Sequence, residues 1–224
     1  MKTILYLALA GLMTFLTACN LNFNVNLPTS TPGAAPTATP SVTATAASPF
    51  AWPDEAGTCT LTTDDVTVLY DRPSTEAQVF SEVESGFTAV VTGRTFDGWV
   101  GFDPGIAQAA NSGVFRLRWV HFDEVSLSGS CLDAPQLSWV PEPDLCYVMP
   151  QESVSVYSGA NTTSNVIATL NVEDFAAVSG LTNNGWAQVD LGAGNTGLSG
   201  IGWMQEADLN VNGGTCDELP TVSP

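Results

Sequence analysis

The chain has 224 residues, of which 44% are apolar and 9% aromatic, enough to build one or two packed cores. Its 23 acidic residues outnumber five basic ones, giving a formal net charge of −18 at pH 7. Phosphate backbones and anionic lipid head groups bind proteins that bring positive charge, so this balance argues against nucleic acid as a partner.

The first residues, 1–18, have the order of an export signal. Lys2 supplies a short positive start, residues 4–15 form an apolar run too short to span a bilayer comfortably, and small residues precede Cys19. The segment "LTAC" resembles the lipobox of bacterial lipoproteins, and an ordinary secretory peptide is the alternative. The resemblance implies cleavage before Cys19 and attachment of diacylglycerol to its sulfur. Because two or more acyl chains anchor durably, we expect the protein to be lipid-anchored on the outer face of the cell membrane, or in the periplasm or outer membrane.

Residues 19–53 consist largely of Thr, Pro, Ala and Ser, with no charged residue. Such a segment cannot bury enough apolar surface to offset the entropy of ordering, and its prolines favour extended states. We predict a disordered linker.

Beyond the linker, the chain contains an internal repeat. The segment "TFDGWVGFD" at Thr95–Asp103 is similar to the segment "TNNGWAQVD" at Thr182–Asp190. Four landmarks recur at 84 to 87 residues: Cys59 with Cys146, Trp99 with Trp186, Trp119 with Trp203, and Cys131 with Cys216. We predict two copies of one module, at residues 54–132 and 146–217, separated by a joint at 133–145 and followed by a disordered tail at 218–224.

Each predicted module begins and ends near a cysteine. Outside the cytoplasm disulfides form and persist, and the four cysteines allow three pairings. The repeat favours Cys59 with Cys131 and Cys146 with Cys216. Catalytic thiols or metal ligands are the weaker alternative, because the sequence has no CxxC motif and only one histidine.

In both copies, short runs in which apolar and polar residues alternate are separated by tight turns. This pattern predicts an all-β fold without long helices. Asp97-Gly98 and Asn184-Gly185 suit two-residue hairpin turns, where a positive backbone angle is needed. The predicted strands are residues 66–70, 88–93, 99–102 and 115–122 in the first copy, and 154–157, 166–170, 175–180, 186–191 and 202–204 in the second.

The second copy, Val154–Leu209, resembles the bacterial SH3 (SH3b) domain. The matching segments are Val156–Gly159, Val166–Leu170, Gly185-Trp186 and Gly202-Trp203. The first copy matches more loosely, through Val68, Arg72–Ser74, Val79-Phe80, Gly98-Trp99 and Arg118-Trp119. It departs from the family in the Arg-Trp pair and in a lengthened loop at 103–113, and both copies lack the usual Leu-Asn-Val-Arg of the first strand.

The resemblance implies two tandem small SH3-like β-barrels, each closed by a disulfide. Family members bind peptidoglycan or short peptides in a shallow groove between loops, where exposed aromatic rings cover a ligand at little ordering cost. The candidate groove residues are Tyr70, Asp71, Tyr157 and Gly159. Trp99, Trp119, Trp186 and Trp203 are expected in the core instead, since large aromatic side chains bury well in small domains.

No catalytic site is expected, and no cofactor or metal is predicted. His121 is the only histidine, and no GxSxG motif is present. The acid pairs Asp64-Asp65 and Asp123-Glu124 are interpreted as surface acids, because neighbours in an extended chain point to opposite sides.

Three hypotheses about function follow. The first is a non-catalytic, membrane-anchored extracytoplasmic protein that binds cell-wall glycan or peptides. The alternative is a structural or assembly component of a cell-envelope complex, which an exposed apolar patch would favour. The third is an unrecognised hydrolase, which requires convergent polar groups in a cleft around His121.

Overall fold

The computed structural model of the chain describes residues 50–108 and 110–224. The predicted signal peptide at 1–18, the predicted lipid-attachment residue Cys19 and nearly all of the predicted linker at 19–53 lie outside these residues. Contacts group the described residues into one compact unit.

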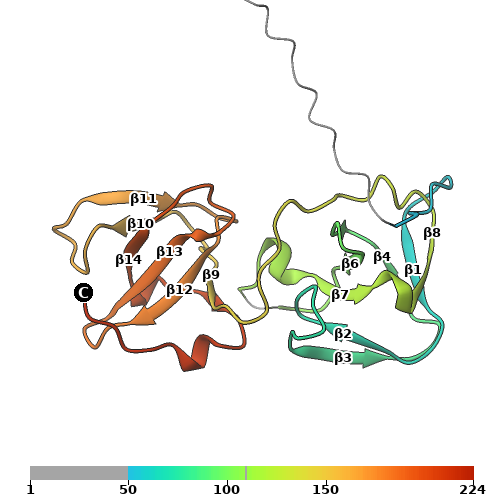
Figure 1. The fold of residues 1–224 in the computed structure, drawn as a ribbon, viewed down its shortest axis with the longest axis horizontal. Coiled ribbons are helices and arrows are strands. Elements are labelled where there is room, and N and C mark those ends of the chain that lie inside the picture. The colour runs from blue at the N-terminus through green and yellow to red at the C-terminus, as the bar shows by residue number, and fades with distance from the viewer. Residues whose placement is uncertain (1–49, 109) are drawn as a thin grey trace, which may run out of the picture. The chain divides into compact units, whose positions relative to one another are not determined.

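Two antiparallel sheets form between residues 60 and 128 (Figure 1). A three-stranded sheet has the order β4-β1-β8, and a five-stranded sheet has the order β3-β2-β7-β6-β5. The strands are β1 (Thr60–Thr63), β2 (Thr67–Tyr70), β3 (Val79–Val83), β4 (Thr88–Val90), β5 (Gly93–Arg94), β6 (Trp99–Phe102), β7 (Arg118–His121) and β8 (Val125–Ser128).

A third sheet, with seven strands, forms between residues 147 and 212 in the order β11-β10-β14-β13-β12-β9-β15. Its strands are β9 (Tyr147–Val148), β10 (Val154–Tyr157), β11 (Val166–Leu170), β12 (Ala176–Leu181), β13 (Trp186–Gly194), β14 (Ile201–Gln205) and β15 (Val211–Asn212). Strands β1 to β8 pair only among themselves, as do β9 to β15. The ladder hydrogen bonds therefore follow the two halves of the sequence repeat.

The helical segments among residues 50–108 and 110–224 are short 3₁₀ turns: η1 (Gly113–Arg116), η2 (Phe122–Glu124), η3 (Glu206–Asp208) and η4 (Cys216–Glu218). Within the described part of the chain, no helix has the length and apolar character needed to cross a membrane. The prediction of an all-β fold is confirmed.

The prediction of closed barrels is not met, because each sheet ends in two edge strands within the described residues. In the first half the break has a local cause. Strand β7 belongs to the five-stranded sheet, and the turn η2 that follows it directs β8 onto β1 in the other sheet. A tight turn between consecutive strands interrupts the ladder there, so the two sheets remain separate.

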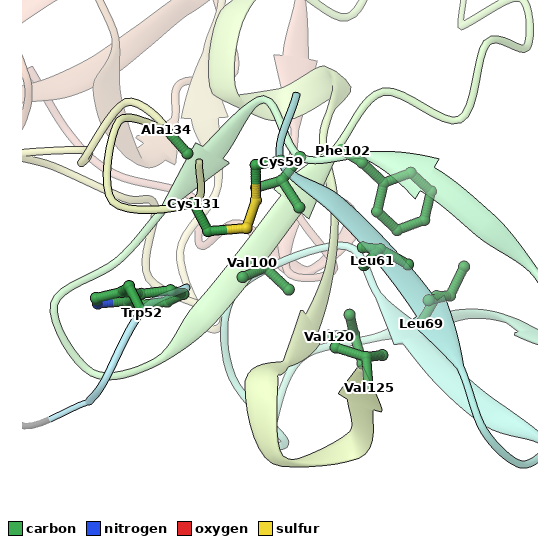
Figure 2. Packing of buried hydrophobic residues seen from close by; sticks show 11 residues of the cluster. Trp52, Cys59, Leu61, Leu69, Val100, Phe102, Val120, Val125, Cys131 and Ala134 are labelled. Carbon is green, nitrogen blue, oxygen red and sulfur yellow. A yellow bond between two sulfur atoms is a disulfide. The ribbon is translucent and has the colours of Figure 1, made fainter. Parts of the chain in front are cut away.

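Each half of the repeat has its own apolar core. In β1 and β2 alternate residues are buried, which is the period of a half-buried strand. The first core contains Leu61, Leu69, Val100, Phe102 and Val120, with the Cys59–Cys131 disulfide at one side (Figure 2). The second core is built from Val148, Val156, Leu170, Val189 and Met204, among others.

Both predicted disulfides are present, Cys59–Cys131 and Cys146–Cys216, with Cα–Cα distances of 4.6 and 4.9 Å. Each one lies beside a pairing of the first strand of its half with the last, β1 with β8 and β9 with β15. The disulfide and the strand pair therefore close the same long loop, so each reduces the entropic cost of forming the other.

The ends of the described chain also pack. Trp52, which the domain prediction places in the linker, is buried in the first core, and Phe50 packs against Phe122 with ring centroids 4.5 Å apart. At the other end, where a disordered tail was predicted, Leu181 forms a parallel bridge to Thr221, and the Val222 amide donates to the Leu181 carbonyl.

A third apolar cluster joins the two halves, and we call it the joint cluster. Phe115, from the turn η1, is fully buried against Phe175 and Tyr147, with centroid distances of 4.8 and 5.7 Å. Trp139 from the predicted joint stacks on Phe175 at 5.8 Å. Burial raises the pKa of Tyr147, whose hydroxyl oxygen accepts from the Glu142 amide.

The lengthened loop at 103–113 supplies polar contacts beside the joint cluster. The Ala110 carbonyl accepts from the side-chain amides of Gln151 and Asn210 at 3.0 and 2.8 Å. Asn212 donates through Nδ2 to Asn111 Oδ1 at 2.8 Å. The loop thus has a structural role, because it and η1 dock the first half of the repeat onto the second.

Gly129→Ala is expected to destabilise the first half by about 2 to 3 kcal/mol. Gly129 has φ of 85°, and an added Cβ would lie 2.2 Å from the Thr58 carbonyl oxygen. Gly86→Ala is the matched control, since Gly86 has φ of 83° with no atom within 4 Å of the new Cβ. Chemical denaturation of both variants measures the difference, and equal losses would contradict the steric argument.

Candidate functional site

A tyrosine and a tryptophan meet edge to face at the same place in each half of the repeat. The Tyr70 and Trp99 ring centroids are 5.7 Å apart at 88°, and those of Tyr157 and Trp186 are 5.6 Å apart at 86°. Both tyrosines are half-buried and both tryptophans are buried. Edge-to-face geometry is the preferred arrangement of aromatic pairs, so each tryptophan holds its tyrosine ring in place.

The strand ladders explain why the two geometries agree. Tyr70 ends β2, between Val79 on β3 and Trp119 on β7, and the register shifts by one residue between Leu69 and Tyr70. In the second half, Tyr157 ends β10 in the same way, between Val166 and Trp203, with the same shift just before it. A bulge of this kind redirects a side chain, and here it does so at both tyrosines.

A hollow with a volume of about 470 Å³ opens beside Tyr70. We call it the tyrosine hollow. Its lining consists of Asp64, Asp65, Val66, Thr67, Val68, Tyr70, Asp123 and Glu124. It therefore combines one aromatic ring and two valines with four carboxyl groups, a mixture suited to an organic ligand that carries positive charge.

The structure brings the two acid pairs together, which sequence reasoning missed. Asp64-Asp65 lies in the bend between β1 and β2, and Asp123-Glu124 lies in the turn η2 after β7. Neither pair is in an extended strand, so the rule that neighbouring residues point apart does not apply to them. Ser126 also donates to Asp64 Oδ2 at 2.7 Å, which links the two segments. The proximity arises from strand pairing between distant residues, for which the sequence carries no local signal.

His121 has partners on both ring nitrogens. Nε2 lies 3.2 Å from the Asp97 carbonyl oxygen, and Nδ1 lies 3.3 Å from Asp123 Oδ2. Its ring also contacts Trp99 edge to face at 5.6 Å. His121 is not part of the lining of the tyrosine hollow. These contacts orient the imidazole within the surrounding structure.

The other candidate residues lie apart from the tyrosine hollow. The Asp71 amide donates to the Gln78 carbonyl, and its carboxylate lies 3.4 Å from Arg72 Nη1, beside a second hollow. Gly159 lies in the turn after β10, where its carbonyl accepts from Ser164 Oγ. Tyr70 and Asp71 thus lie in the first half and Tyr157 and Gly159 in the second, with the two tyrosines at equivalent positions.

The four tryptophans that were expected in the core are buried, with exposed fractions of 0 to 8%. Trp119 packs its ring on Gly101, where an added Cβ would lie 2.9 Å from a ring carbon. Within residues 50–108 and 110–224, no group of three or more His, Cys, Asp or Glu residues is arranged to hold a metal ion.

Comparison of the chain with models of known protein families gives no match, and comparison with curated proteins gives none either. The site is therefore interpreted from its own chemistry.

Proposed function

We propose that this protein is a non-catalytic, membrane-anchored binding protein outside the cytoplasm, whose two SH3b-like modules recognise cell-wall material or peptides. The observation that carries the proposal is the tyrosine hollow, which opens beside one of two equivalent tyrosine and tryptophan pairs. The anchor is a lipid on Cys19, and the Thr- and Pro-rich linker spaces the modules from the membrane. An SH3-like topology within each half accounts for the matching bulges and Gly-Trp positions.

The lining of the tyrosine hollow favours a ligand that bears an amino group. Four carboxyl groups line this hollow together with Tyr70 and two valines. One of them, that of Asp123, also lies 3.3 Å from His121 Nδ1. The four carboxyl groups are exposed, so they attract a cation from solution through an interaction that salt screens. The formal net charge of −18 adds to this attraction and repels anionic wall polymers. We therefore infer that the ligand is a peptide segment with a free amine, such as a cell-wall peptide.

The test is binding of the full, oxidised chain to purified peptidoglycan sacculi stripped of anionic polymer. We expect saturable binding that weakens as salt is raised, because exposed charges are screened. Tyr70→Ala is expected to weaken binding roughly tenfold, through loss of the aromatic contact. Acetylating the free amines of the sacculi should weaken it comparably.

Two controls make the result specific. Tyr157→Ala removes the equivalent ring in the half that lacks Asp64 and Asp123, so it should weaken binding less than Tyr70→Ala. Circular dichroism of both variants establishes that they fold. Undiminished binding to acetylated sacculi, or no binding to sacculi at all, would refute recognition of an amine-bearing wall ligand.

Exposed apolar side chains in the second half favour one other function, a structural role in an envelope complex. Val166 and Ile167 on β11 and Ile201 on β14 are all about half exposed. A Cβ added at Gly202 would lie 3.1 Å from Ile167 Cδ1, so the Ile167 side chain reaches β14. A partner protein covering these residues would make Ile167→Asp, but not Tyr70→Ala, abolish co-purification from detergent-solubilised envelopes.

A further inference from the structure

Two of the chain's four arginines are almost completely buried beside one another. The four are Arg72, Arg94, Arg116 and Arg118, and all lie in the first half of the repeat. Arg72 is 2% exposed and Arg118 is 5% exposed, and the positive charge of Arg72 contributes to lowering the pKa of Arg118. Burying a guanidinium costs free energy unless hydrogen bonds and opposite charge compensate it.

The hydrogen bonds of Arg72 leave one of its donors unused. Nη1 donates to the Asp71 carbonyl at 2.9 Å and faces the Asp71 carboxylate at 3.4 Å. Nη2 donates to Asn212 Oδ1 across the junction between the two halves. The guanidinium also lies over the Phe115 ring at 4.7 Å. Its Nε is buried without a hydrogen-bond acceptor.

Arg118 repeats this arrangement. Nη1 donates to the Leu117 and Phe115 carbonyls at 2.8 and 3.3 Å, and Nη2 donates to Gln108 Oε1. The guanidinium lies over the Phe80 ring at 4.0 Å. Its Nε is also buried with no acceptor.

Charge around these side chains is not balanced. Asp71 faces Arg72, and the pair Asp103 and Arg116, joined at 3.0 Å, lies near Arg118. Three arginines and two aspartates leave one positive charge in excess, within a protein that is otherwise strongly acidic. Burial, only partly offset by Asp71, lowers the pKa of Arg72, and burial likewise lowers that of Arg118. A buried excess charge of this kind favours an anion.

A hollow of about 220 Å³ opens between the two arginines. We call it the arginine hollow. Its lining consists of Asp71, Arg72, Gln78, Val79, Phe80, Arg118 and Asn212. Val79 and Phe80 are exposed apolar side chains, so the lining offers an apolar surface next to the cations. The volume suits a terminal residue rather than a large ligand.

Asp71 Oδ1 is likewise buried without a hydrogen-bond partner. One unpaired acceptor therefore accompanies the two unpaired Nε–H donors of the arginines. Two N–H donors, one carboxylate acceptor and an apolar wall are together complementary to the last residue of a peptide. Because these three atoms are buried, the side chains must turn toward the hollow to meet a ligand. The ligand carboxylate would then accept from the arginines, its amide N–H would donate to Asp71, and its side chain would cover Val79 or Phe80.

We propose that the arginine hollow is a binding site for the C-terminal residue of a peptide, with Arg72 and Arg118 holding its carboxylate and Asp71 its amide N–H. A doubly charged phosphate is disfavoured, since it would exceed the single excess positive charge and face the Asp71 carboxylate. This site is separate from the tyrosine hollow, so it stands whether or not the proposed wall ligand is correct.

The arginine Nε–H signals of the full, oxidised chain provide the test, in ¹H–¹⁵N correlation spectra. Arg94 Nε already donates to the Ala134 carbonyl, and Arg116 Nε to Asp103, so these two signals are internal references. Addition of the dipeptide acetyl-Ala-Ala with a free carboxylate should shift the Arg72 and Arg118 signals, while the Arg94 and Arg116 signals stay in place.

Matched ligands separate the contribution of the ligand carboxylate from that of its amide N–H. The C-terminal amide of acetyl-Ala-Ala should shift neither signal, and the analogue with an ester in place of the last amide should bind several-fold more weakly. Arg118→Gln should weaken the free acid roughly tenfold, since bonds to charged groups are the strong ones. Arg94→Gln, which changes an arginine away from the hollow, should leave the affinity unchanged.

The proposal is overturned if the amide shifts the signals as strongly as the acid, or if all four arginine signals move together. It also fails if inorganic phosphate binds the same two arginines more tightly than the dipeptide. The comparison of acid with amide uses the unchanged protein, so it remains decisive even if Arg118→Gln does not fold.

Discussion

Removing the Cys59–Cys131 disulfide through Cys59→Ala and Cys131→Ala is expected to lower the free energy of unfolding by about 4 kcal/mol. The bond joins residues separated by 72 positions, so cutting it returns a large loop entropy to the unfolded state. The affected half has fewer than 90 residues and a small core, which is the size range in which a covalent link matters most. Denaturant titration of the variant and the parent measures the loss.

The second disulfide is the built-in comparison for this experiment. Cys146–Cys216 spans 70 positions, so the chain-entropy argument predicts nearly the same loss for Cys146→Ala with Cys216→Ala. Loss of far less than 1 kcal/mol in either double variant would show that the strand pairs β1 with β8 or β9 with β15 hold the ends of the loop by themselves.

Phe115→Ala is expected to cost about 3 to 5 kcal/mol and to separate the unfolding of the two halves. The side chain is fully buried and contacts Trp139, Tyr147 and Phe175, and Arg72 lies over its ring. It is the aromatic side chain from the first half within the joint cluster. Deleting it leaves a cavity at the junction, so calorimetry should resolve two transitions in the variant, whereas we expect one transition for the parent.

Phe102→Ala is the control for this effect. Phe102 is 1% exposed but belongs to the core of the first half, where it packs near Leu61 and Phe87. Its loss should destabilise by a similar amount without removing contacts between the halves. A single transition in Phe115→Ala, as cooperative as in the parent, would mean that the polar contacts of the loop at 103–113 suffice for coupling.

Local patterns predicted several strands well. Residues 99–102, 154–157 and 166–170 form strands with the predicted bounds, because alternation of apolar and polar residues and adjoining turn residues mark them directly. The prediction of a strand at 115–122 was only partly correct. Its first residues form the turn η1, and strand β7 begins at Arg118, because Phe115 is buried in the joint cluster instead of pairing in a sheet.

The predictions missed β1, β3, β8, β9 and β15, and the single strand predicted at 88–93 is divided between β4 and β5, which belong to different sheets. Most are short, and their pairing is non-local, as for β1 with β8 and β9 with β15. Strand β3 reads "VFSEV" and has no buried residue, so it lacks the alternation by which a half-buried strand is recognised. Their positions follow from ladder partners far along the chain.

Sequence reasoning predicted the repeat, the all-β class, the two disulfide pairings and the burial of the repeated tryptophans. Each of these depends on residue type and spacing along the chain, which the sequence displays directly. Sequence reasoning did not predict that the sheets remain open, that two acid pairs lie near Tyr70, or that Arg72 and Arg118 are buried beside the same hollow. Those features depend on which distant segments pair, and pairing is selected by the free energy of the whole fold.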